Sequence, residues 1–222
     1  MLYNKQIEVI MKIIVFEGLD KSGKHTLSDK AVDVLRCNGN LVAKMEFPRY
    51  DTEIGKLIKS WLHGEYPVDA HTFELLLAAD KQSAQAKIET FDSIGYDYIV
   101  MDRYIHSQLA YGKYDNKDSW VESLIQFTRN PDYVIYMDVD PDVSMGRQGQ
   151  HGDNDKYESD FARLKSTQQS YYDIFNHSDL PIIRLDANKT LDELKVEEEI
   201  VLHLIDEGKD IPNKYIWSQK KA

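Results

Sequence analysis

Only one cysteine, Cys37, occurs among the 222 residues, so the chain cannot form an internal disulfide. It also lacks any apolar run near the roughly 18 residues that a membrane-spanning helix needs. Residues 1–10 lack the apolar centre of a signal peptide. These absences fit a reducing compartment and predict a cytoplasmic protein with no membrane partner.

Basic residues are scarce relative to acidic ones: 27 Lys and Arg stand against 38 Asp and Glu, for a formal net charge of −11. An acidic surface repels polyanions, so we expect no nucleic acid partner. Any anionic substrate must then be drawn in by a local cluster of lysine and arginine side chains.

Linkers, internal repeats and low-complexity tracts are also missing. With 42% hydrophobic residues, the chain is long enough for one substantial core, and we predict a single domain over residues 1–222. One polar, glycine-containing stretch interrupts the helical patterns, and we expect a mobile lid at about residues 146–158.

Short runs rich in valine and isoleucine alternate with longer helical patterns. The runs predict strands at residues 12–16, 41–47, 97–101, 133–137 and 181–185. The patterns between them predict helices at residues 26–36, 53–63, 71–91, 119–128, 159–175 and 190–205, with Thr52 as an N-cap. This alternation favours a three-layer α/β/α fold, with a five-stranded parallel sheet covered by helices on both faces.

A glycine-rich loop follows the first strand and precedes the first helix. It reads Gly18-Leu19-Asp20-Lys21-Ser22-Gly23-Lys24-His25-Thr26. Glycines let several backbone N–H groups converge, the helix N-terminus adds positive potential, and Lys24 adds a full charge. The pattern therefore predicts a phosphate-binding loop of the P-loop NTPase type.

The loop departs from the usual G-x-x-x-x-G-K-[ST] signature at His25, which stands where a hydroxyl normally binds Mg²⁺. Thr26 comes one position too late to replace that hydroxyl. Imidazole is a poor Mg²⁺ ligand, so we expect the ion to be held by ATP phosphates, water and Asp102. A chance glycine-rich turn and a nucleotide-binding loop without catalysis are the alternatives.

Asp102-Arg103-Tyr104 closes the third predicted strand, where the carboxyl ends of parallel strands face a ligand crevice. An aspartate there can hold Mg²⁺, and an arginine can bridge phosphates. A surface ion pair is the alternative interpretation of this motif.

The order of the motifs is more specific than any one of them. After the loop come Phe47-Pro48-Arg49-Tyr50, then a helix containing Leu77 and Lys81, then Asp102-Arg103-Tyr104 with Ser107 and Tyr111, then Asp155-Lys156-Tyr157-Glu158. From residue 12 onward this order resembles the thymidylate kinase family. The resemblance implies transfer of the γ-phosphoryl group of ATP to dTMP, with Mg²⁺, by a homodimer built through helices.

The resemblance also implies roles for individual residues. Lys24, Lys21, Arg103 and Asp102 match catalytic positions, with Asp102 also the metal ligand and Lys21 reaching the γ-phosphate. The residues implied in ATP binding are Gly18, Lys21, Ser22, Gly23, Lys24, His25, Thr26 and, beside adenine, Arg147. Those implied in monophosphate binding are Asp20, Phe47, Arg49, Leu77, Lys81, Arg103, Ser107, Tyr111, Tyr157 and Glu158.

Two positions depart from the family where the base is recognised. Leu77 stands where members commonly carry a stacking phenylalanine, and Lys81 stands where they commonly carry an arginine. Leucine offers apolar contact without stacking, and lysine offers one flexible charge in place of a planar fork. We therefore hypothesise a relaxed pyrimidine choice that includes dUMP or a 5-modified dUMP. Ordinary helix packing is the other interpretation of Leu77.

Other functions are open to test. A GTPase switch would need Asn-Lys-x-Asp for its base, and the chain has none (Asn188-Lys189 continues as Thr190-Leu191). A deoxynucleoside kinase would share the loop and the Asp-Arg pair. His25 motivates a third possibility, a nucleotide-binding protein without catalysis.

Overall fold

The computed structural model describes residues 10–147 and 160–218. Its strands are β1 Lys12–Gly18, β2 Val42–Glu46, β3 Tyr98–Asp102, β4 Tyr133–Asp138 and β5 Ile182–Asp186. They form one sheet in the order β2-β3-β1-β4-β5, and every neighbouring pair is parallel. The five predicted strands and the parallel sheet are confirmed.

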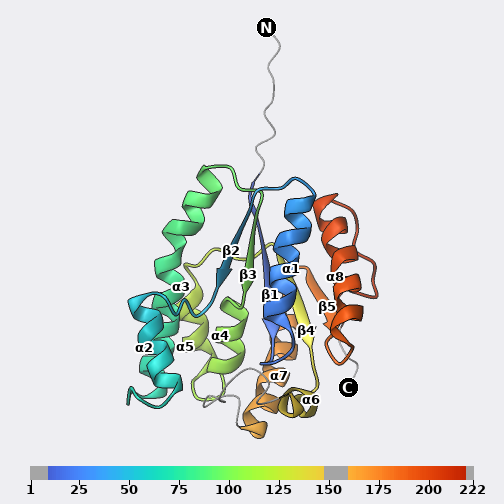
Figure 1. Cartoon of the computed structure of the whole chain (residues 1–222). Helices are drawn as coiled ribbons and strands as arrows, with labels where there is room; N and C mark the ends of the chain where they lie inside the picture. The colour runs from blue at the N-terminus through green and yellow to red at the C-terminus, as the bar shows by residue number, and fades with distance from the viewer. Residues whose placement is uncertain (1–9, 148–159, 219–222) are drawn as a thin grey trace.

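Helices cover both faces of this sheet (Figure 1). They are α1 Lys24–Cys37, α2 Glu53–Leu62, α3 Ala70–Ser93, α4 Ile105–Gly112, α5 Asp118–Ile125, α6 Pro141–Gly146, α7 Phe161–Asn176 and α8 Leu191–Asp206. Within β1, Ile14 and Phe16 pack on the side of α1 and α8, whereas Ile13 and Val15 pack on the side of α3. Alternate strand residues thus enter two apolar layers, which confirms the three-layer architecture.

Most predicted helices begin and end within a few residues of their observed bounds. The side chain of Thr52 accepts a hydrogen bond from the backbone N–H of Gly55, so the predicted cap of α2 is confirmed. Sequence patterns missed α4 and α6. All eight residues of α4 are buried, so it shows no polar face, and α6 is only six residues long.

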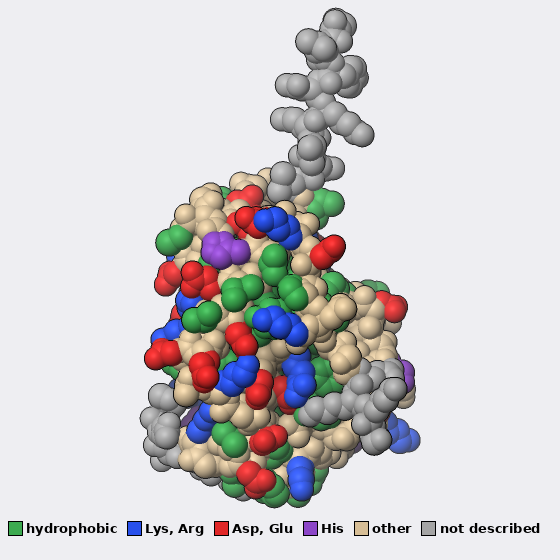
Figure 2. Space-filling view, turned by 90° about the vertical axis from the view of Figure 1, so that its right-hand side faces the viewer, with side chains coloured by type: hydrophobic (Ala, Val, Ile, Leu, Met, Phe, Trp, Pro, Cys, Tyr) green, Lys and Arg blue, Asp and Glu red, His purple; other side chains and the backbone are tan. Residues whose placement is uncertain are grey.

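The face of the molecule on the side of α8 carries both signs of charge. Figure 2 views the molecule from the side of α8 and shows acidic and basic side chains interspersed over this face. Within residues 10–147 and 160–218, no helix has the length and apolar character that crossing a bilayer requires.

Glu198 is an exception to the apolar packing of α8. Its side chain is fully buried, and neither carboxylate oxygen has a hydrogen-bond partner within the described residues. Burial raises the pKa of this carboxyl to about 9, against a partial opposing effect of Lys30. The folded protein therefore holds a proton on Glu198 at a pH where the unfolded chain has released it.

This buried acid makes a stability prediction. Between the ordinary pKa and about 9, the folded state binds more protons than the unfolded state, so stability falls as pH rises. Glu198→Gln keeps the shape without the titration, and it should raise the urea midpoint increasingly from about pH 5 to about pH 9. Glu199→Gln, on the exposed neighbour whose pKa Lys30 lowers, is the control and should not show this trend. Equal pH profiles for parent and Glu198→Gln would contradict the assignment.

Candidate functional site

The phosphate loop turns sharply between β1 and α1 because of two glycines. Gly18 has φ +142°, and a Cβ there would lie 2.6 Å from the backbone oxygen of Met137 on β4. Gly23 has φ +94° and is the N-cap residue of α1. Only glycine adopts these positive φ values without strain, and at Gly18 only glycine leaves room for the backbone of Met137. Backbone conformation therefore explains the two fixed glycines of the motif.

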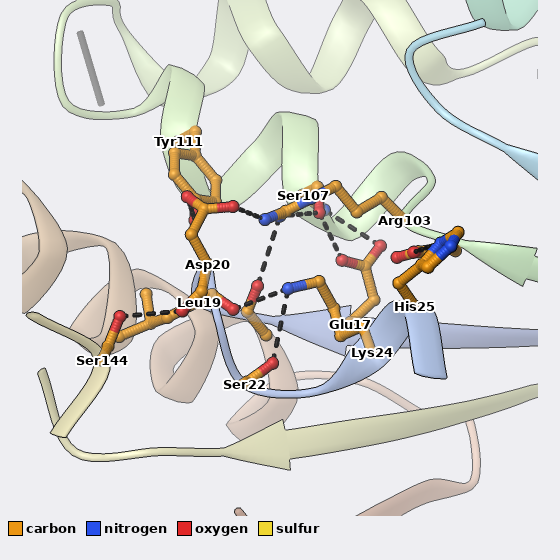
Figure 3. A network of polar contacts seen from close by, with 12 residues as sticks. Glu17, Leu19, Asp20, Ser22, Lys24, His25, Arg103, Ser107, Tyr111 and Ser144 are labelled. Carbon is orange, nitrogen blue, oxygen red and sulfur yellow. Dashed lines mark hydrogen bonds and ion pairs between the residues drawn. The ribbon is translucent and has the colours of Figure 1, made fainter. Parts of the chain in front are cut away.

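Lys24 lies at the centre of this loop and is only 5% exposed. Its ammonium donates to the backbone oxygen of Leu19 at 2.6 Å (Figure 3). Burial lowers its pKa to about 8; Arg103 lowers it further, while Asp20 opposes the change. The loop therefore holds a largely desolvated cation beside the first turn of α1.

Glu17, the residue before the loop, joins β1 to the start of α4. One carboxylate oxygen accepts from the backbone N–H groups of Tyr104 at 2.9 Å and Ser107 at 3.1 Å. The other accepts from the hydroxyls of Ser107 and, at 3.0 Å, Tyr171. Helix α4 has no capping side chain of its own, so this buried carboxylate satisfies its first N–H groups.

Arg103 connects this support to the phosphate loop. Its φ of +61° turns the chain at the end of β3, and its guanidinium donates to Gly18 O at 3.2 Å and Ser107 Oγ at 3.1 Å. It also pairs with Asp20, which accepts from the hydroxyl of Tyr111 at 2.9 Å (Figure 3). Asp20, Arg103, Ser107 and Tyr111, separated in the sequence, thus form one cluster.

Asp20 and Arg103 each stabilise the charged form of the other. Burial alone would raise the pKa of Asp20, but Arg103 and then Lys24 hold it below its ordinary value. Burial alone would lower the pKa of Arg103, but Asp20 holds it above its ordinary value. Both groups are therefore ionised at neutral pH, and the arginine fork is held in one place.

A pocket opens beside the cluster. Its lining residues are Asp20, Phe47, Pro48, Tyr50, Leu62, Phe73, Leu77, Lys81, Arg103, Tyr104, Ser107, Gln108 and Tyr111. The lining combines an apolar wall of aliphatic and aromatic side chains with the charged groups of Asp20, Lys81 and Arg103. Such a combination suits a flat, partly apolar molecule that ends in an anion.

Lys81 and Gln108 add polar groups to the apolar wall. The Lys81 ammonium lies 5.9 Å from the ring centroid of Phe47, and burial lowers its pKa to about 8. Sequence reasoning missed Gln108. Its amide nitrogen donates to Glu74 O at 3.1 Å, and its buried Oε1 has no partner within the described residues. No pattern around Gln108 signals this position, because the pocket forms only in three dimensions.

Arg49 points away from the cluster. Its Nε donates to Asp80 Oδ1 at 2.9 Å, and its Nη2 donates to the backbone oxygen of Asp80 and to Ser83 Oγ. The guanidinium thus holds the turn after β2 against α3, while the adjacent Pro48 and Tyr50 line the pocket.

The opposite side of the phosphate loop contacts α6 and the chain after β5. Arg147 donates to Lys21 O at 3.2 Å and to Ala187 O at 3.1 Å. Ser144 donates to Asp20 O at 2.8 Å.

The remaining predicted site residues are placed as follows. Lys21 has φ +58° within the loop. Thr26 is exposed on α1. Tyr157, Glu158 and most of the expected lid lie outside the described residues.

Asp102 has a different environment from Arg103. It is 6% exposed, and its Oδ1 has no hydrogen-bond partner within the described residues. Its other oxygen lies 3.5 Å from Nδ1 of His25, and Glu46 lies beside both. These three residues are the group that could hold a metal ion in the described part of the chain.

Comparisons with known proteins agree on one family. A family model described as thymidylate kinase matches residues 16–200. The thymidylate kinase of Plasmodium falciparum is 31% identical over 187 residues, which cover 82% of this chain and 85% of that protein. The human thymidylate kinase is 29% identical over 190 residues, covering 85% and 87%. A solved thymidylate kinase structure from Candida albicans shares the fold with a TM-score of 0.75, at 23% identity, and covers 94% of this chain and 97% of that one.

The contacts of Glu17 make a prediction about the support of the site. Glu17→Gln replaces an acceptor oxygen with a donor amide facing N–H and O–H groups, so it should lower the free energy of unfolding by about 1–3 kcal/mol. Tyr171→Phe removes one donor and leaves both backbone bonds, so its loss should be smaller, about 0.5–1.5 kcal/mol. Urea unfolding of both variants measures this difference. A Glu17→Gln protein as stable as the parent would show that the carboxylate does not hold α4.

Proposed function

This chain belongs to the thymidylate kinase family, and we propose that it transfers the γ-phosphoryl group of ATP to a pyrimidine deoxynucleoside monophosphate, chiefly dTMP. The chain is a nucleoside monophosphate kinase by its family. The observation that carries the choice of acceptor is Arg103. It borders the pocket and also contacts the phosphate loop through Gly18 and Asp20.

In this proposal the two nucleotides meet at Arg103. ATP places its phosphates against Lys24 and the loop, with Arg147 beside adenine. The acceptor places its 5′-phosphate at Arg103 and its base toward Leu77 and Lys81. An arginine that lies between two phosphates can donate to both, which favours an in-line approach.

No strong general base is needed for this reaction. The nucleophile is an oxygen of the acceptor phosphate, which is already anionic near neutral pH. The task is to bring two anions together, so Lys24, Lys21 and Arg103 neutralise their repulsion. Nε and Nη2 of Arg49 are already engaged by Asp80 and Ser83. We therefore assign that phosphate to Arg103 first.

Mg²⁺ accompanies ATP in the proposal. When bound, it neutralises charge on the phosphates of the donor. The unpartnered Oδ1 of Asp102 fits an oxygen ligand to this ion, directly or through water.

Base selection depends on the wall that contains Leu77, Lys81 and Gln108. Lys81 can donate to a carbonyl oxygen of thymine or uracil, and the unpartnered Oε1 of Gln108 can accept from a ring N–H. Leu77 replaces ring stacking with apolar contact. We propose that the site accepts dUMP or a 5-modified dUMP alongside dTMP.

Assembly, location and lid complete the proposal. We propose a homodimer formed through helices, as the family resemblance implies. We propose one domain, working in the cytoplasm, whose segment at about 146–158 closes over the nucleotides through Tyr157 and Glu158 and limits ATP hydrolysis. Light scattering of the purified chain tests the dimer.

One coupled assay of ADP release tests the substrate class, with dTMP, dUMP, dCMP and thymidine as acceptors. We expect turnover with dTMP and dUMP within about tenfold in kcat/KM, because one methyl group in an apolar pocket contributes only modest selectivity. dCMP should be poor, because its amino group faces the Lys81 donor. Turnover of thymidine alone would indicate a deoxynucleoside kinase, and none at all a binding protein. A dTMP preference of about a hundredfold or more over dUMP would reject only the relaxed base choice.

Lys21 provides a test of the transition-state assignment. Lys21→Ala removes a cation proposed to meet the γ-phosphate, so kcat should fall by about 10²–10³-fold with little change in KM for dTMP. Lys21→Arg keeps the charge and should retain most activity. Steady-state kinetics of both variants measure this. Full kcat in Lys21→Ala would exclude the catalytic role.

A further inference from the structure

Three possible metal ligands meet beside the phosphate loop. They are His25 in the first turn of α1, Glu46 at the end of β2 and Asp102 at the end of β3. One ligand atom from each lies within 4.8 Å of the other two. Nδ1 of His25 is 3.5 Å from Asp102 Oδ2 and 4.0 Å from Glu46 Oε2.

The sheet places the two carboxylates together. Glu46 and Asp102 are register partners in the parallel pair β2–β3, so they lie about 4.8 Å apart along the hydrogen-bonding direction. Asp102 lies two residues beyond Val100, which packs in the same apolar layer as α1. Both carboxylates therefore face His25. Like charges opposite one another are unfavourable unless a cation lies between them.

The imidazole is oriented so that its nitrogens face three carboxylates. Nε2 lies 3.5 Å from Asp29, one turn further along α1, and Nδ1 faces Asp102 and Glu46. Carboxylates only accept hydrogen bonds, so Nδ1 either carries its hydrogen and donates to them or uses its lone pair to bind a cation. Oδ1 of Asp102, on the same buried carboxylate, has no hydrogen-bond partner in the described residues, so no donor competes with an ion for that oxygen.

The distances suit a metal. Ligand atoms that each lie about 2.0–2.2 Å from one ion are about 3.0–3.5 Å apart from each other. The observed separations from Nδ1 are at or slightly above this range. The His25 and Glu46 side chains are 65% and 51% exposed, so small rotations can close the set. Asp29 at Nε2 matches the carboxylate that commonly orients a metal-bound histidine.

The ligand types indicate which metal. Mg²⁺ prefers oxygen ligands and keeps its water, whereas imidazole suits the divalent ions of the first transition row. We propose that His25, Glu46 and Asp102 form a divalent-cation site that binds Mn²⁺ and similar transition ions more tightly than Mg²⁺. Only the further step, that this ion contacts ATP phosphates, rests on the proposed kinase function.

Titration of the nucleotide-free full chain with Mn²⁺ tests the site directly. Electron paramagnetic resonance reports the free ion, whose signal disappears on binding. We expect one Mn²⁺ per chain, displaced by Mg²⁺ only at an excess of about tenfold or more. His25→Thr, which restores the usual hydroxyl, should weaken Mn²⁺ binding by about tenfold or more and remove the preference over Mg²⁺. Glu46→Gln should weaken it similarly, and both variants should unfold in urea like the parent.

His63→Ala is the matched control, because His63 is an exposed histidine at the end of α2, remote in sequence from the loop. It should bind Mn²⁺ like the parent. If the parent binds no Mn²⁺ without nucleotide, or if His25→Thr binds it equally well, the proposal is wrong. These outcomes do not depend on the acceptor assay. A protein that binds Mn²⁺ but phosphorylates no monophosphate would refute the kinase and leave the metal site standing.

Discussion

The carboxylate of Glu17 is the constraint on which the rest of the site depends. A fully buried carboxylate is costly unless its lone pairs are satisfied, and four donors meet it: two backbone N–H groups and two hydroxyls. These bonds fix α4 to the end of β1. Ser107, held in this way, accepts from Arg103, and Arg103 pairs with Asp20 of the phosphate loop. One carboxylate thus sets the distance between the loop and the pocket.

The acidic chain concentrates desolvated cations where anions are proposed to bind. Burial lowers the pKa values of both Lys24 and Lys81 to about 8, so each ammonium has given up water in advance. Acidic neighbours limit the lowering of these pKa values: Asp20 acts on Lys24, and Asp80 acts on Lys81. A phosphate entering beside Lys24 would favour its charged form and raise its pKa again. Fixed cations of this kind need little reorganisation when charge develops in the transition state. This preorganisation is the main source of the rate enhancement in electrostatic catalysis.

Sequence patterns predicted the sheet, the phosphate loop and the Thr52 cap of α2, because these depend on neighbouring residues. They missed α4, since a helix buried on every side has no amphipathic period. They also missed Glu17, Gln108 and Glu46 as site residues, because their partners are distant in the chain. A charged residue inside the apolar run of β1 was the available signal for Glu17. Arg49 stays a prediction as an acceptor-phosphate residue, and its ion pair with Asp80 is a contact that no sequence pattern signalled.

The end of β3 shows how one short motif serves two opposite electrostatic demands. A kinase site needs cations for phosphate and anions for a metal ion, and the two sets must not neutralise each other. Asp102, the last residue of the strand, faces α1 and His25. Arg103, the next residue, has a positive φ, and its side chain pairs with Asp20 on the pocket side. Adjacent residues of opposite charge are thereby kept apart by backbone conformation. Oδ1 of Asp102 has no hydrogen-bond partner in the described residues, and in our proposal Asp102 shares its cation with His25.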